Sequence, residues 1–188
     1  MSGLLVTVIV LVVLATAVLF AVGQFNKLRR LDILAQGAWA GIDTLLAKRA
    51  DLVPNLVETV KGAADFERGT MDDVTNARAK AAGATTVAQT AAADGELTQA
   101  LGRLFAVAEA YPQLTATAGF RDLQGQLTQV EGELQFARQY YNDSVVTLNT
   151  AVKTVPSMWF AGMASVHERE MYAEPDAGRR AAPTVDFT

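Results

Sequence analysis

The residues best suited to chemistry are scarce in this chain of 188 residues, which contains one histidine and no cysteine. Without cysteine there can be no thiolate metal site, cysteine nucleophile or disulfide. His167 lies in a His-Glu-Arg-Glu run and lacks the HExxH spacing of zinc enzymes, so we expect it at the surface or in an interface. The glycines are scattered and form no phosphate-binding loop. The sequence therefore predicts no cofactor, no metal and no enzymatic activity.

A row of carboxylates recurs every seven residues, at Asp51, Glu58, Asp65 and Asp72, which places them on one face of a helix. Such a row could bind divalent cations or a basic partner. The interpretation we favour is a solvated face with local ion pairs, such as Glu58 with Lys61 three residues later.

Charged residues also interrupt or flank the apolar stripes, the rows of apolar residues that recur at three- and four-residue steps. Buried charge is costly unless it is paired, so we predict that these residues form ion pairs between helices. Contacts between subunits are an alternative, and a catalytic carboxylate at Glu67 near Arg103 is a third. The residues are Arg49, Glu67, Arg78, Arg103, Glu109 and Arg138.

The N-terminal segment Leu4–Val22 contains no charged residue. As a helix it would be roughly 28 Å long, close to the hydrocarbon thickness of a bilayer, so we expect residues 1–23 to form a transmembrane anchor. Lys27, Arg29 and Arg30 follow this segment, which by the positive-inside rule puts the N-terminus outside and the body in the cytoplasm. A cleaved signal peptide is the less favoured alternative.

The apolar stripes after the anchor predict an all-α fold, with the transmembrane helix followed by an antiparallel bundle of three to four long helices over residues 24–156. Pro54 either kinks one long helix or starts a second. Residues 83–95 are rich in Ala, Thr and Gly and are expected to form a loop, with a new helix starting at Glu96. The clearest helix covers 120–152.

Residues 157–173 form an apolar, amphipathic C-terminal segment, too short to span a bilayer. It could lie in the membrane interface, pack under the bundle, or fill a groove on a neighbouring subunit. The residues predicted to contact membrane or neighbour are Trp159, Phe160, Met163, Tyr140 and Tyr141. The tail, residues 174–188, is expected to be extended or disordered.

Several blocks resemble the LemA family, in the same order and spacing: Trp39-Ala-Gly-Ile-Asp43, residues 48–62, residues 77–81, residues 101–112 and Phe136-Ala-Arg-Gln-Tyr-Tyr-Asn-Asp143. The resemblance implies a bacterial inner-membrane protein with one N-terminal span and a cytoplasmic helical domain. It implies no reaction and no cofactor, because the family has no settled activity. Some relatives are associated with the shaping of magnetosome membranes.

These observations predict a non-enzymatic, membrane-anchored scaffold that self-associates and organises or shapes the bacterial inner membrane. Its expected partners are membrane lipid and other copies of the chain. The alternative is an adaptor that recruits another envelope protein, such as a protease or sensor. A net charge of −4 gives no reason to expect nucleic acid as a partner.

Overall fold

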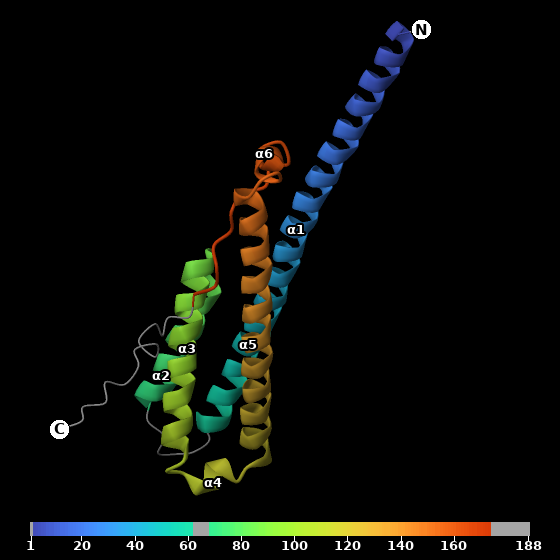
Figure 1. The fold of residues 1–188 in the computed structure, drawn as a ribbon. Coiled ribbons are helices and arrows are strands. Elements are labelled where there is room, and N and C mark those ends of the chain that lie inside the picture. The colour runs from blue at the N-terminus through green and yellow to red at the C-terminus, as the bar shows by residue number, and fades with distance from the viewer. Residues whose placement is uncertain (1, 62–67, 174–188) are drawn as a thin grey trace, which may run out of the picture. The chain divides into compact units, whose positions relative to one another are not determined.

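The computed structural model describes residues 2–61 and 68–173, and this part of the chain is helical with no strand (Figure 1). The predicted all-α class is therefore confirmed. The predicted tail, 174–188, lies outside the described residues. The helices are α1 (Ser2–Lys61), α2 (Arg68–Gly83), α3 (Val87–Ala108), α4 (Pro112–Thr115), α5 (Ala118–Lys153) and α6 (Met158–Ala161).

Pro54 lies inside α1, and the helix continues past it to Lys61. Of the two alternatives for this proline, the start of a second helix is therefore excluded. Proline has no N–H, so the carbonyl of Ala50, which accepts from residue 54 in a regular α-helix, loses its partner in the helix.

The chain divides into two compact units, and α1 and α5 each run through both. Unit 1 comprises Met1–Ala40 and Tyr140–Met171. Its buried residues come from both helices, with Leu28 and Ala35 of α1 and Val145 and Leu148 of α5 fully buried, and Trp39 of α1 packs on Tyr141 of α5. This pairing follows from the three- and four-residue spacing of apolar residues on both helices.

An extended segment after α6 is fastened to unit 1 by hydrogen bonds. The Asn149 side chain accepts from the Arg169 N–H and donates to the Arg169 carbonyl, both at 2.9 Å. The Arg169 guanidinium forms an ion pair with Asp32, with Nη2 and Oδ1 2.9 Å apart. The side-chain amide of Asn149 thus supplies both hydrogen-bond partners of the Arg169 backbone, which has none in a helix or sheet.

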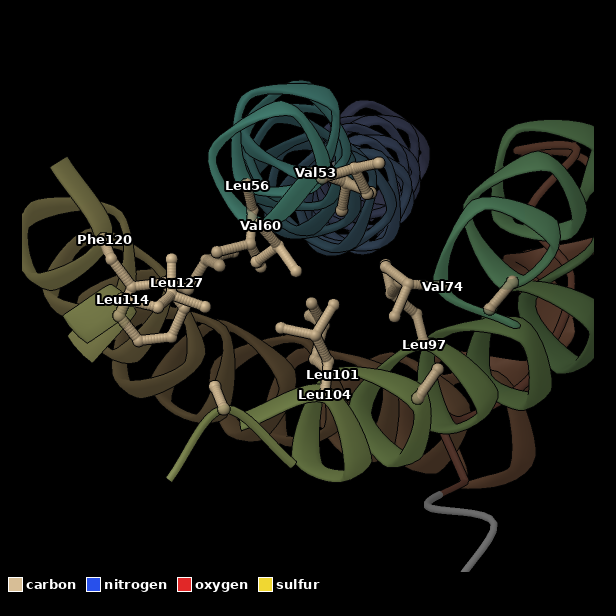
Figure 2. Close-up of a cluster of buried hydrophobic side chains, with 14 residues drawn as sticks. Val53, Leu56, Val60, Val74, Leu97, Leu101, Leu104, Leu114, Phe120 and Leu127 are labelled. Atoms are coloured by element: carbon tan, nitrogen blue, oxygen red, sulfur yellow. The ribbon is translucent and has the colours of Figure 1, made fainter. Parts of the chain in front are cut away.

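Unit 2 comprises Gly41–Gln139 together with the chain from Tyr172 onward. Figure 2 shows its apolar cluster, to which every helix of the unit contributes. The labelled members are Val53, Leu56 and Val60 of α1, Val74 of α2, Leu97, Leu101 and Leu104 of α3, Leu114 of α4, and Phe120 and Leu127 of α5.

The predicted loop over 83–95 is wrong for most of its length, because α3 begins at Val87. Thr86 caps the helix by accepting a hydrogen bond from the Gln89 N–H. Alanine has the highest helix propensity, and Ala91 and Ala93 are buried, so this alanine-rich turn of helix packs closely against its neighbours. By contrast, α5 lies within two residues of its predicted start and one of its predicted end.

Candidate functional site

Large apolar side chains remain exposed on unit 1. All side chains from Gly3 to Phe20 are exposed, as expected for a segment that faces lipid. Further along, Ile33 is 60% exposed and Leu34 43% exposed on α1, while Tyr140 is 54% and Val146 49% exposed on α5. We call these last four residues the apolar surface of unit 1. It contains Tyr140, one of the predicted contact residues.

The predicted C-terminal contact residues surround α6. Trp159 is 68% exposed and Met163 is 70% exposed, whereas Phe160 is half-buried. The Phe160 ring meets Phe20 of α1 edge to face, with ring centroids 6.3 Å apart. Ser157 is buried, and its hydroxyl donates to Gln24 Oε1 of α1 at 2.9 Å. The structure therefore groups Trp159, Phe160 and Met163 at one place, beside α1.

Tyr141 requires a correction, because it is buried within unit 1 and cannot contact membrane or a neighbouring subunit. Its ring packs on Trp39 at a centroid distance of 5.3 Å, and its hydroxyl donates to the Glu170 carbonyl at 2.8 Å. Burial raises the pKa of Tyr141. Its apolar spacing on α5 is that of a core residue, and the adjacent Tyr140 points outward because successive helical residues are about 100° apart.

Two of the predicted ion-pair residues meet in unit 2 around a carboxylate that sequence reasoning missed. Asp94 of α3 is 2% exposed. It accepts hydrogen bonds from Arg49 Nη1 at 2.7 Å, from Arg138 Nη2, and from the Tyr172 hydroxyl at 2.7 Å. Glu131 Oε2 lies 2.9 Å from Arg49, and its Oε1 accepts from Arg138 at 3.2 Å. We call these five residues the Asp94 cluster.

The charges of the Asp94 cluster balance, with two guanidinium groups facing two carboxylates. Burial acts to lower the pKa of Arg138, but attraction to Asp94 and Glu131 outweighs it, and the pKa is raised. Burial and the nearby Asp94 charge raise the pKa of Tyr172, so its hydroxyl stays protonated and donates. The Arg138 guanidinium also lies over the Tyr172 ring, 5.3 Å from its centroid.

Three polar atoms of the cluster have no hydrogen bond among the described residues: Nε of Arg49, Nε of Arg138 and Oε2 of Glu131. The Glu131 oxygen is close to Arg49 but poorly aligned, so that contact is electrostatic. The cluster joins α1, α3, α5 and the C-terminal segment within unit 2. The sequence places Asp94 in a predicted loop and so gives no sign that it is buried. The available signal is that two arginines, one within and one beside an apolar stripe, require a buried acid.

Arg78 makes a contact that the sequence did not predict. Its Nε donates to the Ala50 carbonyl at 2.8 Å, across from α2 to α1. This is the carbonyl that Pro54 leaves without a partner in the helix. Among residues 2–61 and 68–173, the interaction of Arg78 is therefore a hydrogen bond to the backbone at the proline.

The remaining predicted ion-pair residues contribute less. Arg103 lies 3.3 Å from Asp73, but both side chains are 57% exposed, so their attraction is weakened by solvent. Glu109 is exposed at the C-terminal cap of α3, with no ion pair to any described residue. Glu67 lies outside the described residues.

The carboxylate row is exposed where it is described, with Asp51 and Glu58 on α1 and Asp72 on α2. Asp65 lies outside the described residues. The expected local pair is present, with Glu58 and Lys61 3.0 Å apart. Over residues 2–61 and 68–173, no three His, Asp or Glu side chains are grouped as a metal site would require. His167 is exposed.

An open groove of about 560 Å³ lies between α2 and α3. Arg103 lines it, and its other charged residues are Asp73, Lys80 and Glu96. These groups pair with one another, since Lys80 Nζ and Glu96 Oε2 are 2.6 Å apart and Arg103 contacts Asp73. The groove thus brings together mutually paired charges.

Comparison with known proteins decides the family. The family model described as "LemA family" matches residues 38–187, most of the chain. The chain belongs to the LemA family. This LemA family chain is also similar to "Magnetosome protein MamQ 1" and "MamQ 2" of Paramagnetospirillum magneticum and to "Magnetosome protein MamQ" of Magnetospirillum gryphiswaldense. Each is 30% identical over 86 residues, which is 46% of this chain and 32% of the relative.

The chain therefore aligns with about a third of these relatives' length. One helix of the described chain, α1, is long and apolar enough near its N-terminal end to cross a membrane. Its apolar side chains are exposed there, and together these features indicate a membrane-anchored protein.

Proposed function

We propose that this LemA family protein is a non-enzymatic, membrane-anchored scaffold that self-associates and organises or shapes the bacterial inner membrane. The observation that carries the proposal is the apolar surface of unit 1, where large side chains of α1 and α5 are exposed beyond the apolar span. Exposed apolar side chains on both helices of unit 1 favour contact with another molecule.

The position of this surface favours protein over lipid as its cover. Ile33 follows the last residue of the apolar span, Val22, by eleven residues, or about 16 Å of helix. The headgroup region of a bilayer leaflet is only about 5–8 Å thick. In a helix near the membrane normal, Ile33 lies outside the lipid, which favours a protein surface as its cover.

A second copy of the chain is the simplest partner. Anchors in one membrane hold all copies in the same orientation and raise their effective concentration, so one face can meet its equivalent or a neighbouring face around an axis along the membrane normal. Repeated contacts of this type hold the spans together and can impose curvature. The similarity to magnetosome proteins supports the proposal.

The primary test is the mass of the full-length protein, crosslinked in its membrane, extracted in mild detergent and measured by light scattering. We expect a large assembly, and a smaller one for Ile33→Ser with Leu34→Ser. Asn26→Ser is the matched control: it changes an exposed residue of α1 without removing apolar area. A monomer or dimer for the wild type contradicts the scaffold, and capture of a distinct protein would then favour the adaptor that recruits a protease or sensor.

Membrane shaping has its own test. The protein is reconstituted into vesicles of phosphatidylethanolamine and phosphatidylglycerol, and vesicle diameters are measured by electron microscopy. We expect tubes or a narrowed diameter distribution, lost with the Ile33 and Leu34 substitutions. Diameters that match those of protein-free vesicles contradict this part of the proposal.

The proposed orientation puts the N-terminus outside and the helical domain in the cytoplasm. Lys27, Arg29 and Arg30 are exposed immediately after the span, in agreement with the positive-inside rule. Because the chain has no cysteine, Ser2→Cys and Glu170→Cys give single labelling sites. In intact cells an impermeant thiol reagent should label the first and not the second; the reverse pattern inverts the topology.

A further inference from the structure

The short helix α6 and the residues around it lie at a defined level along α1. Ser157 donates to Gln24, and the Phe160 ring contacts Phe20. All four residues belong to unit 1, and α6 lies beside α1 (Figure 1). Phe20 lies within the apolar span, and Gln24 is the first strongly polar side chain after it. These two contacts therefore fix α6 at the end of the span.

Helix geometry converts this level into a depth. Gln24 follows Phe20 by four residues, or about 6 Å of helix. Lys27 follows Phe20 by seven residues, or about 10 Å. If the span fills the hydrocarbon, Phe20 lies inside it, Gln24 at its edge and Lys27 among the headgroups. Phe160 then shares the depth of Phe20, and Ser157 that of Gln24.

The exposed residues at this level have the chemistry of the membrane interface. Trp159 and Met163 are more than two-thirds exposed, and Met158 is 44% exposed. Tryptophan is enriched at the boundary between headgroups and acyl chains, because its ring is apolar and its N–H needs a polar partner. Lys27, Arg29 and Arg30 are exposed just beyond and complement anionic headgroups.

We propose that α6 and Met163 form a second membrane contact, in which Trp159 and Met163 insert into the headgroup–acyl boundary of the leaflet where α1 leaves the bilayer. The partner is the lipid itself. This deepens the proposed function and rests on its membrane anchor, but it does not depend on self-association. The contact would fix the tilt of unit 1 relative to the bilayer, which an isolated span leaves free.

The test uses tryptophan fluorescence, because the chain has only two tryptophans. Trp39→Phe leaves Trp159 as the single reporter. The full-length variant is reconstituted into vesicles of phosphatidylglycerol and phosphatidylcholine, the latter brominated either near the headgroup or near the chain end. We expect the emission of Trp159 to be blue-shifted. Lipid brominated near the headgroup should quench most of this emission, and lipid brominated near the chain end should quench it less.

Matched positions extend the test. In a background with both tryptophans replaced by Phe, Met163→Trp should be quenched like Trp159. Glu170→Trp should emit like an indole in water and stay unquenched, because the adjacent Arg169 pairs with Asp32, about 12 Å beyond Gln24 along α1. Trp159→Phe, which retains the packed Trp39, reports that unit 1 is folded.

The outcomes separate this inference from the proposed function. If the chain floats with the vesicles but Trp159 is unquenched by either lipid, the second contact is overturned and the anchor stands. If the chain does not float, the anchor fails and the inference falls with it. Equal quenching of Trp159 and the Glu170→Trp reporter also overturns the inference, because it removes the specific depth.

Discussion

The hydrogen bond from Arg78 to Ala50 gives a sharp prediction, because Pro54 is the reason that its acceptor is available. In the wild type, Arg78→Met keeps the apolar stem but leaves the Ala50 carbonyl without this donor. A hydrogen bond from a charged donor contributes about 1.5–3 kcal/mol, so we expect Arg78→Met to lower the free energy of unfolding by about that amount.

The same substitution should matter much less once Pro54 is replaced. Pro54→Ala restores an N–H that bonds to the Ala50 carbonyl within the helix, and then Arg78→Met is expected to cost about 0.5 kcal/mol or less, like an ordinary surface change. The coupling energy between the two positions is thus about 1–2.5 kcal/mol. Pro54→Ala also affects the unfolded chain. This effect is the same with and without Arg78→Met, so it cancels from the coupling energy.

The assay is urea unfolding of the full-length protein in mild detergent, followed by far-ultraviolet circular dichroism. Arg103→Met is the matched control, because this arginine forms an exposed ion pair worth about 0–1 kcal/mol and has no contact with Ala50. Additive effects of Arg78→Met and Pro54→Ala, within about 0.5 kcal/mol, would refute the reasoning.

Further predictions concern the polar contacts of each unit. Asp94→Ala should lower the unfolding free energy by about 3–5 kcal/mol in the same assay, because it leaves two buried guanidinium groups with one carboxylate, whereas Lys80→Gln should change it by less than about 1 kcal/mol. The pKa of Tyr172 is raised in the folded chain, so above pH 10.0 its hydroxyl ionises first in the unfolded chain. The free energy of unfolding therefore falls as pH rises. With Tyr172→Phe this fall should be shallower in unfolding curves across the same pH range. Asn149→Ala should speed hydrogen exchange of the Arg169 amide, and an unchanged rate would show that the side chain does not hold the segment.

The sequence predicts the long helices well, because their information is periodic and local. The stripe from Phe120 to Val152 identifies α5 almost to the residue, since burial of one helix face repeats along its length. The start of α3 was missed for the opposite reason. Small buried alanines leave no stripe, and the acid among them, Asp94, is recognisable as a core residue only beside Arg49 and Arg138.

The candidate contact residues were only partly predictable. Neighbouring aromatics on α5, Tyr140 and Tyr141, look alike in sequence, but one is exposed and the other donates to the Glu170 carbonyl in the core. The Glu170 carbonyl belongs to a segment that is neither helix nor strand. The spacing of apolar residues therefore does not predict where this segment runs. The level of α6 was equally hidden, because it depends on the single contacts with Phe20 and Gln24.

Unit 1 has exposed apolar side chains at two levels along α1, and we propose a different partner for each: lipid at Trp159 and another copy of the chain at Ile33. Trp159 is attached at the level where the span ends, so lipid is within reach. Ile33 lies about 16 Å past the span, where the proposed cover is another copy of the chain. The two surfaces should therefore respond independently: Ile33→Ser should reduce assembly and leave the quenching of Trp159 unchanged. If that substitution also abolishes quenching, the Trp159 contact arises from the assembly and not from the chain's own anchor.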